Sequence, residues 1–550
     1  MGESRDSSDT DAADGRELLR SAHFWAGVVL LVGFAALAAW LLSTPIDDAY
    51  ISFRYLANWI RGEGLVFNPG EYVEGYSNLL WIVVLAVPAV LGAPAQEAGP
   101  ILELLLAVGC LVVMTLGAEK AIRARSKWNL AAPLLLAVSS PFVFWIGKGM
   151  EVIFYTFLLL VFATVVLRSR EREALRLREG LWIGLVAAAV ALTRPEGLMA
   201  PGAVLAALVL TERGRRKPYL LALTILAGAV VGQFAFRLIY YGPFWPNTYY
   251  AKRLPLGVAL SAGIRYLRQF AIGMSEREAW FYANGWLGHL PIWIACLVAA
   301  RFGLREWRRL WPVALQMAAL VAIAVYVGGD WMPGFRFLLP AIPLGCLLVA
   351  AGLRELAGDS ATPRWRRILA RALLLILIAS EAVGLVCMVR SHEFERWRHH
   401  YGNYDDMAKW LNENGRTGSL VALSDIGIIA YKNPDLRFID VLGLTDPHIA
   451  SLPGYHYLKT DVNYVLQREP DYVLAMLFVW PERELVRPKT HFDAEFLKHV
   501  AAEEDYASVG RVRGWQEGLR GERWVLFEIY ARKASAGQGD DEATTAGLHQ

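Results

Sequence analysis

Long apolar blocks constrain this chain more than any other feature of its sequence. They occupy, among others, residues 24–43, 131–147, 153–168, 180–193 and 310–327. Because about 20 helical residues cross the hydrocarbon core of a bilayer, these blocks predict a chain that crosses the membrane many times. The sequence is 55% hydrophobic and only 19% charged, which is too apolar for an ordinary soluble globule. A formal net charge of +3 gives no reason to expect a nucleic-acid partner.

Basic clusters follow some of the apolar blocks and are missing after others. Cytoplasmic loops of membrane proteins are enriched in Lys and Arg, so we place these clusters in the cytoplasm. They lie at residues 123–127, 168–178, 213–217, 301–309 and 364–371. The outward segments are then 44–98, 148–151, 194–197, 237–285 and 328–337. This alternation predicts about eleven transmembrane helices, a cytoplasmic N-terminus and a C-terminal domain outside the membrane.

The apolar segment 78–93 does not fit this alternation. A full crossing there would place the basic cluster at 123–127 on the wrong side of the membrane. We therefore expect an interfacial or half-inserted element, kinked at Pro88, and a true span stays open as the alternative.

The sequence divides into four parts. Residues 1–22 are polar and precede an uncleaved signal anchor, so we expect a disordered cytoplasmic tail. A polytopic α-helical transmembrane part then covers 23–389. From 390 to 533, a helical pattern at 405–414 and short β-branched runs predict an extracytoplasmic α/β domain. Residues 534–550 carry almost no bulky apolar side chains and are expected to be disordered.

The first outward segment begins with two adjacent carboxylates, Asp47 and Asp48, where the first span ends. A carboxylate at the membrane surface can take the proton of an acceptor hydroxyl, and partial desolvation raises its pKa toward the useful range. The alternative is that the pair caps the helix that follows. Capping by one of the two leaves the other available for catalysis.

The chain after the pair has an amphipathic pattern. Ile51 and Tyr55 recur at helical spacing opposite Arg54, which predicts a helix that lies along the membrane interface and anchors there. Turns rich in Gly and Pro then bring Glu74 and Tyr76 back toward the membrane. Arg54, Glu74 and Tyr76 are candidate substrate-binding residues.

Two short outward segments carry charges against the apolar trend. Lys148 and Glu151 lie in one, and Arg194 and Glu196 lie in the other. Ionisable residues at the ends of spans are functional candidates by default, and outward cations point to an anionic ligand such as a lipid phosphate. Snorkelling or a local ion pair is the alternative for each.

Two further outward segments combine aromatic and charged residues. Aromatic rings at 237–253 suit a sugar, but they are equally typical of a membrane-interface belt. The second segment is a glycine-rich turn at 328–340, where glycine allows the backbone to approach a ligand. The candidate substrate-binding residues in the two segments are Asn247, Tyr250, Lys252, Asp330, Trp331 and Arg336.

Histidines and cysteines give no metal-binding pattern. His289, His392, His399 and His400 have no ligand spacing to nearby Cys, Asp or Glu. The 4 cysteines all fall inside apolar segments, which excludes a disulfide framework and a cysteine metal site. We expect no zinc, and a divalent cation at Asp47, Asp48 or Asp330 stays open. The sequence contains neither a phosphate-cradling glycine loop nor a nucleotide-binding fingerprint.

Seven segments taken together resemble the GT-C membrane glycosyltransferases. They are DDAYISFRY (47–55), GLVFNPGEYVEGYSNLLW (64–81), GME (149–151), RPE (194–196), YYGPFWPNTYYAK (240–252), GGDWMPGFR (328–336) and FIDVLGLTDPHIA (438–450). Within that class the chain is similar to the actinobacterial terminal arabinofuranosyltransferase family. The Asp pair, the NPGEYVEG loop and the GGDWMPGFR turn carry the resemblance most specifically.

The resemblance implies a polyprenyl-phosphate sugar donor, with arabinofuranose as the sugar in the characterised branch. It implies transfer outside the membrane to a growing cell-envelope glycan, with a catalytic base in the first outward segment. That role falls on Asp47 or Asp48. The cations expected to stabilise the charge that grows on the departing phosphate are Lys148, Arg194, Lys252 and Arg336.

Two other classes of function stay open. About eleven apolar spans also suit a transporter or a lipid flippase, although the sequence has no internal repeat and its charges gather at one membrane face rather than in mid-span. The third class is a structural or glycan-binding membrane protein whose outer domain does the binding.

Overall fold

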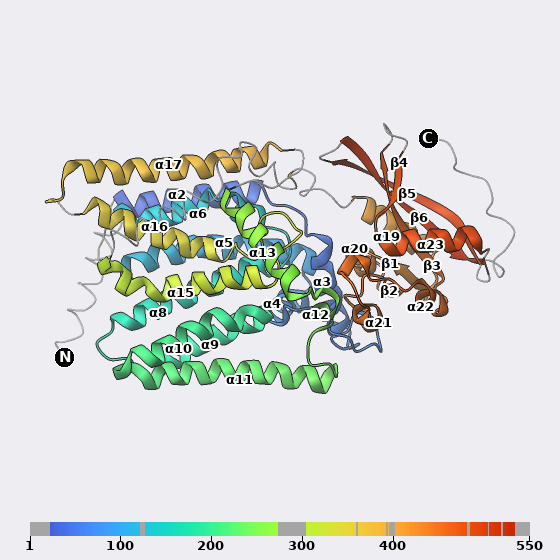
Figure 1. Cartoon of the computed structure of the whole chain (residues 1–550), viewed down its shortest axis with the longest axis horizontal. Coiled ribbons are helices and arrows are strands. Elements are labelled where there is room, and N and C mark those ends of the chain that lie inside the picture. The colour runs from blue at the N-terminus through green and yellow to red at the C-terminus, as the bar shows by residue number, and fades with distance from the viewer. Residues whose placement is uncertain are drawn as a thin grey trace.

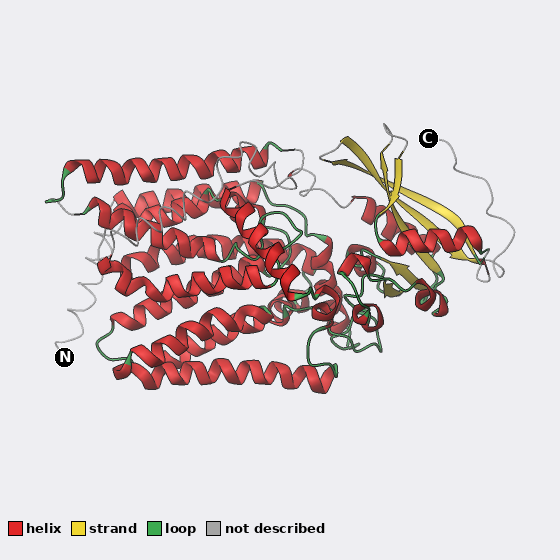
Figure 2. Cartoon of the chain, viewed as in Figure 1, coloured by secondary structure: helices red, strands yellow, loops and turns green. Residues whose placement is uncertain are grey.

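A computed structural model of the chain describes residues 22–121, 127–272, 304–358, 361–391, 394, 402–480, 485–503, 505–518 and 521–533. The tail predictions for 1–22 and 534–550 lie outside these ranges, apart from Ala22. Five histidines and one cysteine lie outside them as well: His289, His392, His399, His400, His549 and Cys296. Figure 2 shows a bundle of helices with a second, strand-containing domain at one end.

The membrane part is a bundle of helices, most of which run roughly parallel to one another (Figure 1). Its first half comprises α2 (Ala22–Trp40), α3 (Asp47–Ile60), α4 (Leu79–Val90), α5 (Ala95–Ala121), η1 (Lys127–Leu130), α6 (Ala131–Ala137), α7 (Ser140–Phe144), α8 (Val152–Glu171) and α9 (Leu177–Thr193). Its second half comprises η2 (Pro195–Leu198), α10 (Met199–Thr211), η3 (Arg213–Arg215), α11 (Arg216–Tyr240), α12 (Asn247–Lys252), α13 (Leu256–Ile272), α15 (Leu304–Tyr326), α16 (Ala341–Ala357) and α17 (Arg364–Val389).

Among the described residues, five helices are long and apolar enough to cross a membrane. They are Ala95–Thr115, Val152–Glu171, Arg213–Tyr240, Arg308–Tyr326 and Arg364–Val389. Shorter apolar helices, such as Trp25–Trp40 and Pro195–Thr211, pack beside them. The chain is therefore a multi-pass membrane protein, while the expected number of about eleven spans stays a prediction.

The structure accounts for the segment that breaks the predicted alternation. Helix α4 has only 12 residues and contains Pro88, so it extends for about 18 Å. That length is well short of a hydrocarbon core of about 30 Å. The α4 helix is thus too short for the alternative of a full crossing.

The C-terminal domain is built on one mixed sheet. Its elements are α19 (Gly402–Asn414), β1 (Leu420–Leu423), α20 (Ile428–Lys432), β2 (Arg437–Asp440), α21 (Pro447–Ser451), η4 (His456–Leu458), α22 (Val462–Gln467), β3 (Tyr472–Trp480), β4 (Leu485–Pro488), α23 (His491–Ala502), β5 (Tyr506–Gly518) and β6 (Gly521–Arg532). The strand order is β2-β1-β3-β6-β5, with β4 paired to β3. Strand β1 is parallel to both β2 and β3, and the remaining pairs are antiparallel.

Alternate residues of the central strands point into two different cores. Val421 and Leu474 join a large cluster that continues into the membrane helices, whereas Ala422 and Val473 pack with Phe496 on the other face. This alternation is the normal period of a strand buried on both faces. The inner half of the domain therefore shares its core with the bundle.

Helix α3 lies between the bundle and the C-terminal domain (Figure 1), where it packs on α20. The sequence predicts an anchoring helix along the membrane interface, and the structure adds that its polar face is covered by protein. Arg54 and Asn58 are 1% and 0% exposed, because the C-terminal domain and the loop after α3 cover that face. Trp59 and Ile60, at the end of the helix, are exposed.

Candidate active site

The Asp pair opens α3 beside the turn that precedes α8. The backbone N–H of Ile46 donates to the carbonyl oxygen of Lys148 at 3.0 Å, which fixes the start of α3 against that turn. No side chain hydrogen bond caps α3 at its N-terminus. The capping alternative therefore does not hold for the helix in which the pair lies.

Asp47 instead caps a helix of the C-terminal domain. Its carboxylate oxygens accept the backbone N–H groups of Gly427 at 3.1 Å and Ile428 at 2.7 Å, at the start of α20. A Cβ on Gly427 would lie 1.9 Å from the Asp47 carbonyl oxygen, so only glycine fits this contact. Burial, with the charge of Asp425, raises the pKa of Asp47 to about 8. Both oxygens of Asp47 are engaged in holding the domain.

Asp48 lies among charges that come from three other segments. Burial raises its pKa above the ordinary value of a carboxylate, the charges of Lys252 and Arg336 lower it, and those of Asp330 and Asp425 raise it again. Within the described part of the chain, the Asp48 carboxylate has no hydrogen-bond or salt-bridge partner. Of the two aspartates, it is the one that remains available to a ligand.

The glycine-rich turn after α15 brings an ion pair to Asp48. Arg336 Nε lies 2.8 Å from Asp330 Oδ2, and both side chains are less than a tenth exposed. The N–H does not point along this line, so the contact is held by charge rather than by an aligned hydrogen bond. The guanidinium also lies 6.0 Å from the ring centroid of Trp145. Trp331, by contrast, is 48% exposed.

The glycines of this turn have positive φ, but they face protein rather than open space. A Cβ on Gly329 would lie 2.4 Å from the ring of Tyr266, and one on Gly334 would lie 2.6 Å from Trp145 Nε1. The expected close approach is therefore to neighbouring aromatic side chains. Its consequence is a rigid turn that fixes Asp330 and Arg336.

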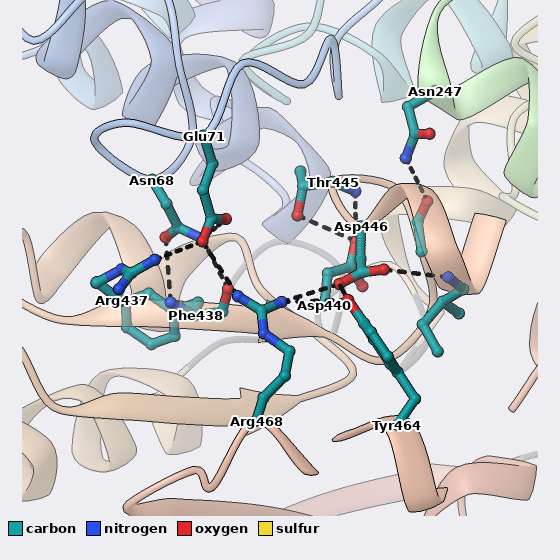
Figure 3. A network of polar contacts seen from close by, with 12 residues as sticks. Asn68, Glu71, Asn247, Arg437, Phe438, Asp440, Thr445, Asp446, Tyr464 and Arg468 are labelled. Carbon is teal, nitrogen blue, oxygen red and sulfur yellow. Dashed lines mark hydrogen bonds and ion pairs between the residues drawn. The ribbon is translucent and has the colours of Figure 1, made fainter. Parts of the chain in front are cut away.

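Helix α12 carries Lys252 and is docked on the C-terminal domain. Asn247 Nδ2 donates to two backbone carbonyls of the turn after β2, at 2.9 and 3.1 Å, and one of these bonds is drawn in Figure 3. Lys459 Nζ donates to the Tyr250 carbonyl oxygen at 2.8 Å. Asn247 and Tyr250 thus hold α12 in place, while Lys252 at its end is exposed and acts on Asp48 through its charge.

Three of the charged candidates form one buried network. Arg194 donates to Glu151 at 2.6 Å and to Glu196 at 2.5 Å, and Asn78 Nδ2 donates to Glu151 at 2.9 Å. The local ion pair that the sequence left as an alternative is therefore present here. It reduces the positive charge that Arg194 offers to a phosphate.

Lys148 lies in a turn that a buried carboxylate holds. Its ammonium is 4.8 Å from the ring centroid of Phe144, and the residue is fully buried. Glu103 of α5 accepts the N–H groups of the two glycines that flank Lys148, at 2.7 and 3.1 Å. This turn is thus tied to both α5 and the start of α3.

Arg54, Glu74 and Tyr76, the candidates of the first outward segment, are committed to packing. Arg54 donates to backbone carbonyls at the C-terminal end of α20 and beyond it. Glu74 forms a buried bidentate pair with Arg237, and the hydroxyls of Tyr76 and Tyr241 lie 3.1 Å apart. None of the three is among the charges that act on Asp48.

Sequence reasoning missed two residues that bear on the site. Glu103 interrupts the apolar run of α5, and an ionisable residue inside a span was a signal for it. Asp425 lies in the connection that follows β1, and its charge acts on both Asp47 and Asp48. The signal for Asp425 was its position after a strand of a parallel sheet, where ligand-binding residues gather.

Within the described ranges, no group of three or more His, Cys, Asp or Glu side chains is arranged to hold a metal ion. Both carboxylate oxygens of Asp47 accept hydrogen bonds from the start of α20, and the Asp330 carboxylate forms an ion pair with Arg336. Of the three residues named for a divalent cation, Asp48 alone therefore has a carboxylate without a partner in the described chain.

Two family models match the chain. One, described as "Predicted membrane protein (DUF2142)", matches residues 68–340, and the other, "Domain of unknown function (DUF8728)", matches residues 391–528. The first match agrees with a membrane location. The boundary between the two models falls close to the start of the C-terminal domain.

Two relatives of this chain are named terminal beta-(1->2)-arabinofuranosyltransferase. The one from Corynebacterium glutamicum is 26% identical over 420 residues, which cover 70% of this chain and 57% of the relative. The one from Mycobacterium tuberculosis is 28% identical over 261 residues, which cover 45% of this chain and 40% of the relative. The chain thus spans about half the length of these relatives, and the resemblance inferred from the sequence motifs is confirmed.

Solved structures show the fold. ArnT from Cupriavidus metallidurans in the apo state superposes with a TM-score of 0.57 at 14% identity, covering 92% of this chain and 98% of ArnT. The apo oligosaccharyltransferase of Archaeoglobus fulgidus superposes with a TM-score of 0.53 at 12% identity. The superposition covers 84% of this chain and 74% of the oligosaccharyltransferase. The membrane part of the chain therefore has the fold of the GT-C enzymes.

Proposed function

We propose that this GT-C-fold membrane protein is a glycosyltransferase that moves a sugar from a polyprenyl-phosphate donor to a cell-envelope glycan. The names of its two relatives support this activity. A lipid-phosphate donor is supported by structures of the same fold, since ArnT has been solved bound to undecaprenyl phosphate and the archaeal oligosaccharyltransferase in complex with dolichol phosphate.

The proposed sugar is arabinofuranose. Both curated relatives carry arabinofuranosyl transfer in their names. The Corynebacterium relative aligns over 70% of this chain, so the similarity is not limited to one motif. Against a transporter or flippase, the relatives and the fold alike are those of glycosyltransferases, and that alternative is not favoured.

The main structural support for the proposal is the environment of the Asp48 carboxylate. It is a carboxylate with a raised pKa, it has no partner within the described residues, and two cations act on it from different segments. Such a group suits a general base, because its pKa is displaced toward neutral pH. Asp47 supports it from the same turn by holding the C-terminal domain over the site.

In the proposed reaction, the acceptor hydroxyl gives its proton to Asp48. The hydroxyl oxygen then forms a bond to the anomeric carbon of the donor sugar as the bond from that carbon to the phosphate oxygen breaks. The lipid phosphate leaves with the electron pair and one more negative charge. Lys252 and Arg336, which act on Asp48, stabilise this charge.

Lys148 and Arg194 have a smaller part in this scheme than the sequence indicated. Arg194 is shared between Glu151 and Glu196, and Lys148 is fully buried beside Phe144. We assign both to the shape and charge of the wall behind the Asp pair rather than to direct phosphate binding.

The proposed orientation puts the site on the outer face. The connections α8–α9, α10–α11 and α16–α17 lie at the end of the bundle away from the C-terminal domain (Figure 1). Basic residues gather there, and Arg170 reaches both Glu212 and the backbone of Arg309. By the positive-inside rule that end is cytoplasmic, which makes the C-terminal domain extracytoplasmic and supports a cytoplasmic N-terminus.

The test is a transfer assay on the purified, membrane-reconstituted protein with a panel of polyprenyl-phosphate sugars and a glycan acceptor. We expect transfer from the arabinofuranosyl donor. Asp48→Asn should lower kcat about a hundredfold or more, the contribution typical of a general base. Transfer at the wild-type rate by Asp48→Asn, with the protein folded, would remove the proposed base.

A further inference from the structure

The sheet of the C-terminal domain presents its parallel strand ends to the membrane part. Helix α20 follows β1 and packs on α3, and α21 follows β2 and packs on α12. The carboxyl ends of β1 and β2 therefore face the Asp pair. Strand β1 has β2 on one side and β3 on the other, all parallel, so the strand order reverses next to β1. In open α/β sheets, ligands bind outside the strand ends at such a reversal.

The turn after β2 is closed by its own hydrogen bonds. Asp440 accepts the backbone N–H groups of Leu442 and Thr445, at 2.9 and 2.8 Å. Asp446 accepts from the hydroxyl of Tyr464 at 2.9 Å and from Arg468 at 3.2 Å (Figure 3). These carboxylates shape the turn that docks α12, and they leave no acceptor for a ligand.

The turn after β1 is different. Asp425 Oδ2 accepts from the Tyr404 hydroxyl and the Lys489 ammonium, but Asp425 Oδ1 has no donor within the described part of the chain. The Asp425 side chain is 16% exposed. Its charge acts on both Asp47 and Asp48, so it lies near the proposed base.

The partners of Asp425 decide which task suits it. The Tyr404 hydroxyl and the Lys489 ammonium both donate to Asp425 Oδ2, so they fix the orientation of the carboxylate. Its second oxygen is a strong hydrogen-bond acceptor for a hydroxyl group. Asp48 has no such partners, so the two carboxylates are suited to different roles at one site.

We propose that Asp425 is an acceptor-binding residue: its Oδ1 accepts a hydrogen bond from a hydroxyl of the acceptor sugar and orients a neighbouring hydroxyl toward Asp48. The inference rests on the proposed function and extends it, because it makes the C-terminal domain one wall of the active site. Tyr404 and Lys489 are positioning residues that hold the carboxylate.

The test compares Asp425→Asn with the wild-type protein in steady-state transfer. The Asn carbonyl oxygen can still accept from Tyr404 and Lys489, so the fold is retained. We expect the acceptor KM to rise about tenfold or more, as for the loss of a hydrogen bond to a charged group. The donor KM and the melting temperature should stay close to those of wild type. Glu495→Gln, a change at an exposed ion pair with Lys498, is the control and should alter none of these values.

Two outcomes overturn the inference. An unchanged acceptor KM in Asp425→Asn shows that the carboxylate does not touch the acceptor. A fall in melting temperature with donor and acceptor KM changed together shows that Asp425 only supports the fold.

Binding without turnover separates this inference from the proposed function. The probe is a short α-arabinofuranosyl oligosaccharide, with a mannosyl oligosaccharide of equal length as the reference, titrated into the full chain by calorimetry without donor. Asp425-dependent binding by a protein that transfers no sugar refutes the proposed function alone. Normal transfer with Asp425-independent binding refutes this inference alone.

Discussion

At the scale of single residues, the account rests on two neighbouring aspartates with different surroundings. Asp47 accepts two backbone N–H groups from the start of α20, and Asp48 accepts none from the described chain. The sequence left capping and catalysis open for the pair. In the structure, Asp47 caps α20, a helix distant in the sequence. Asp48 is left as the proposed base.

The charge of Lys252 should set the pH dependence of the reaction. Lys252 lowers the pKa of Asp48, which burial raises. Replacing it by methionine removes that opposing charge, so the pKa of Asp48 rises further and less of the base is ionised at a given pH. In Lys252→Met, the acidic limb of the kcat/KM profile should move to higher pH, by about one unit or less because Lys252 is exposed.

The control for this shift is Lys252→Arg, which keeps the charge and should keep the position of the limb. A limb that stays in place in Lys252→Met, whatever happens to the maximum rate, contradicts the assignment of Asp48 as the ionising base.

Candidate site residues could be proposed from the sequence only where neighbouring residues in the chain gave the signal. The Asp pair was proposed because it lies where an apolar block ends. Lys252 was proposed from an aromatic outward segment, and Asp330 and Arg336 from a glycine-rich turn. The burial of Arg54 could not be predicted, because two of its acceptors, Ala430 and Asn433, lie more than 370 residues away in or next to α20. A helical pattern shows that a face is polar but not what covers it.

At the scale of elements, α3 and α20 form the joint on which the site depends. Asp47 holds the N-terminal end of α20, and Arg54, two turns later on α3, donates to the carbonyls at its C-terminal end. The short helix is thus held at both ends by one helix of the membrane part. Because Asp425 lies in the short connection between β1 and α20, this joint also places the proposed acceptor-binding residue.

A side chain at position 427 should loosen this joint. Gly427→Ala puts a Cβ 1.9 Å from the Asp47 carbonyl oxygen, so α20 must move away from α3. Overpacking of this kind costs about 1–3 kcal/mol of unfolding free energy. Hydrogen exchange of the full chain should accelerate at 427–436.

The matched control is Gly402→Ala, where a Cβ meets no atom within 4 Å and exchange should be unchanged. Equal exchange at 427–436 in wild type and Gly427→Ala is the outcome that refutes the joint.

The elements were predictable to different degrees, for physical reasons. The sequence predicts a helix at 405–414, and the structure has α19 at Gly402–Asn414, because its apolar residues keep helical spacing. Strand β5 (Tyr506–Gly518) escaped prediction because its exposed face carries Arg511 and Arg513 and because Gly510 and Gly514 interrupt it. Its partner β6 supplies the apolar face instead.

At the scale of the whole molecule, the first outward segment clamps the C-terminal domain along the edge of its sheet. Asn68 Nδ2 donates to the Phe438 carbonyl oxygen at 2.8 Å and its Oδ1 accepts the Phe438 N–H at 3.1 Å, which completes the free edge of β2 as a further strand would. Glu71 joins both Arg437 and Arg468 (Figure 3). The two parts therefore share one surface, and the site lies on it.

The sequence predicted this architecture through charge rather than through contacts. Basic clusters marked one end of the bundle, so the remaining segments had to share the other end. What the sequence did not contain was the pairing of the 68–71 loop with the C-terminal domain. Those contacts join parts of the chain more than 360 residues apart, and one sequence carries no signal for them.

In the proposed orientation, the Asp pair and the C-terminal domain meet on the outer side of the membrane. The most direct measurement is labelling of single cysteines, introduced in intact cells into a chain whose native cysteines are replaced, with a thiol reagent that does not cross membranes. Glu63→Cys beside α3 and Glu503→Cys in the C-terminal domain, both exposed, should react before permeabilisation. Glu173→Cys, exposed between α8 and α9, should react only afterwards. Labelling of position 63 or 503 only after permeabilisation would contradict the account.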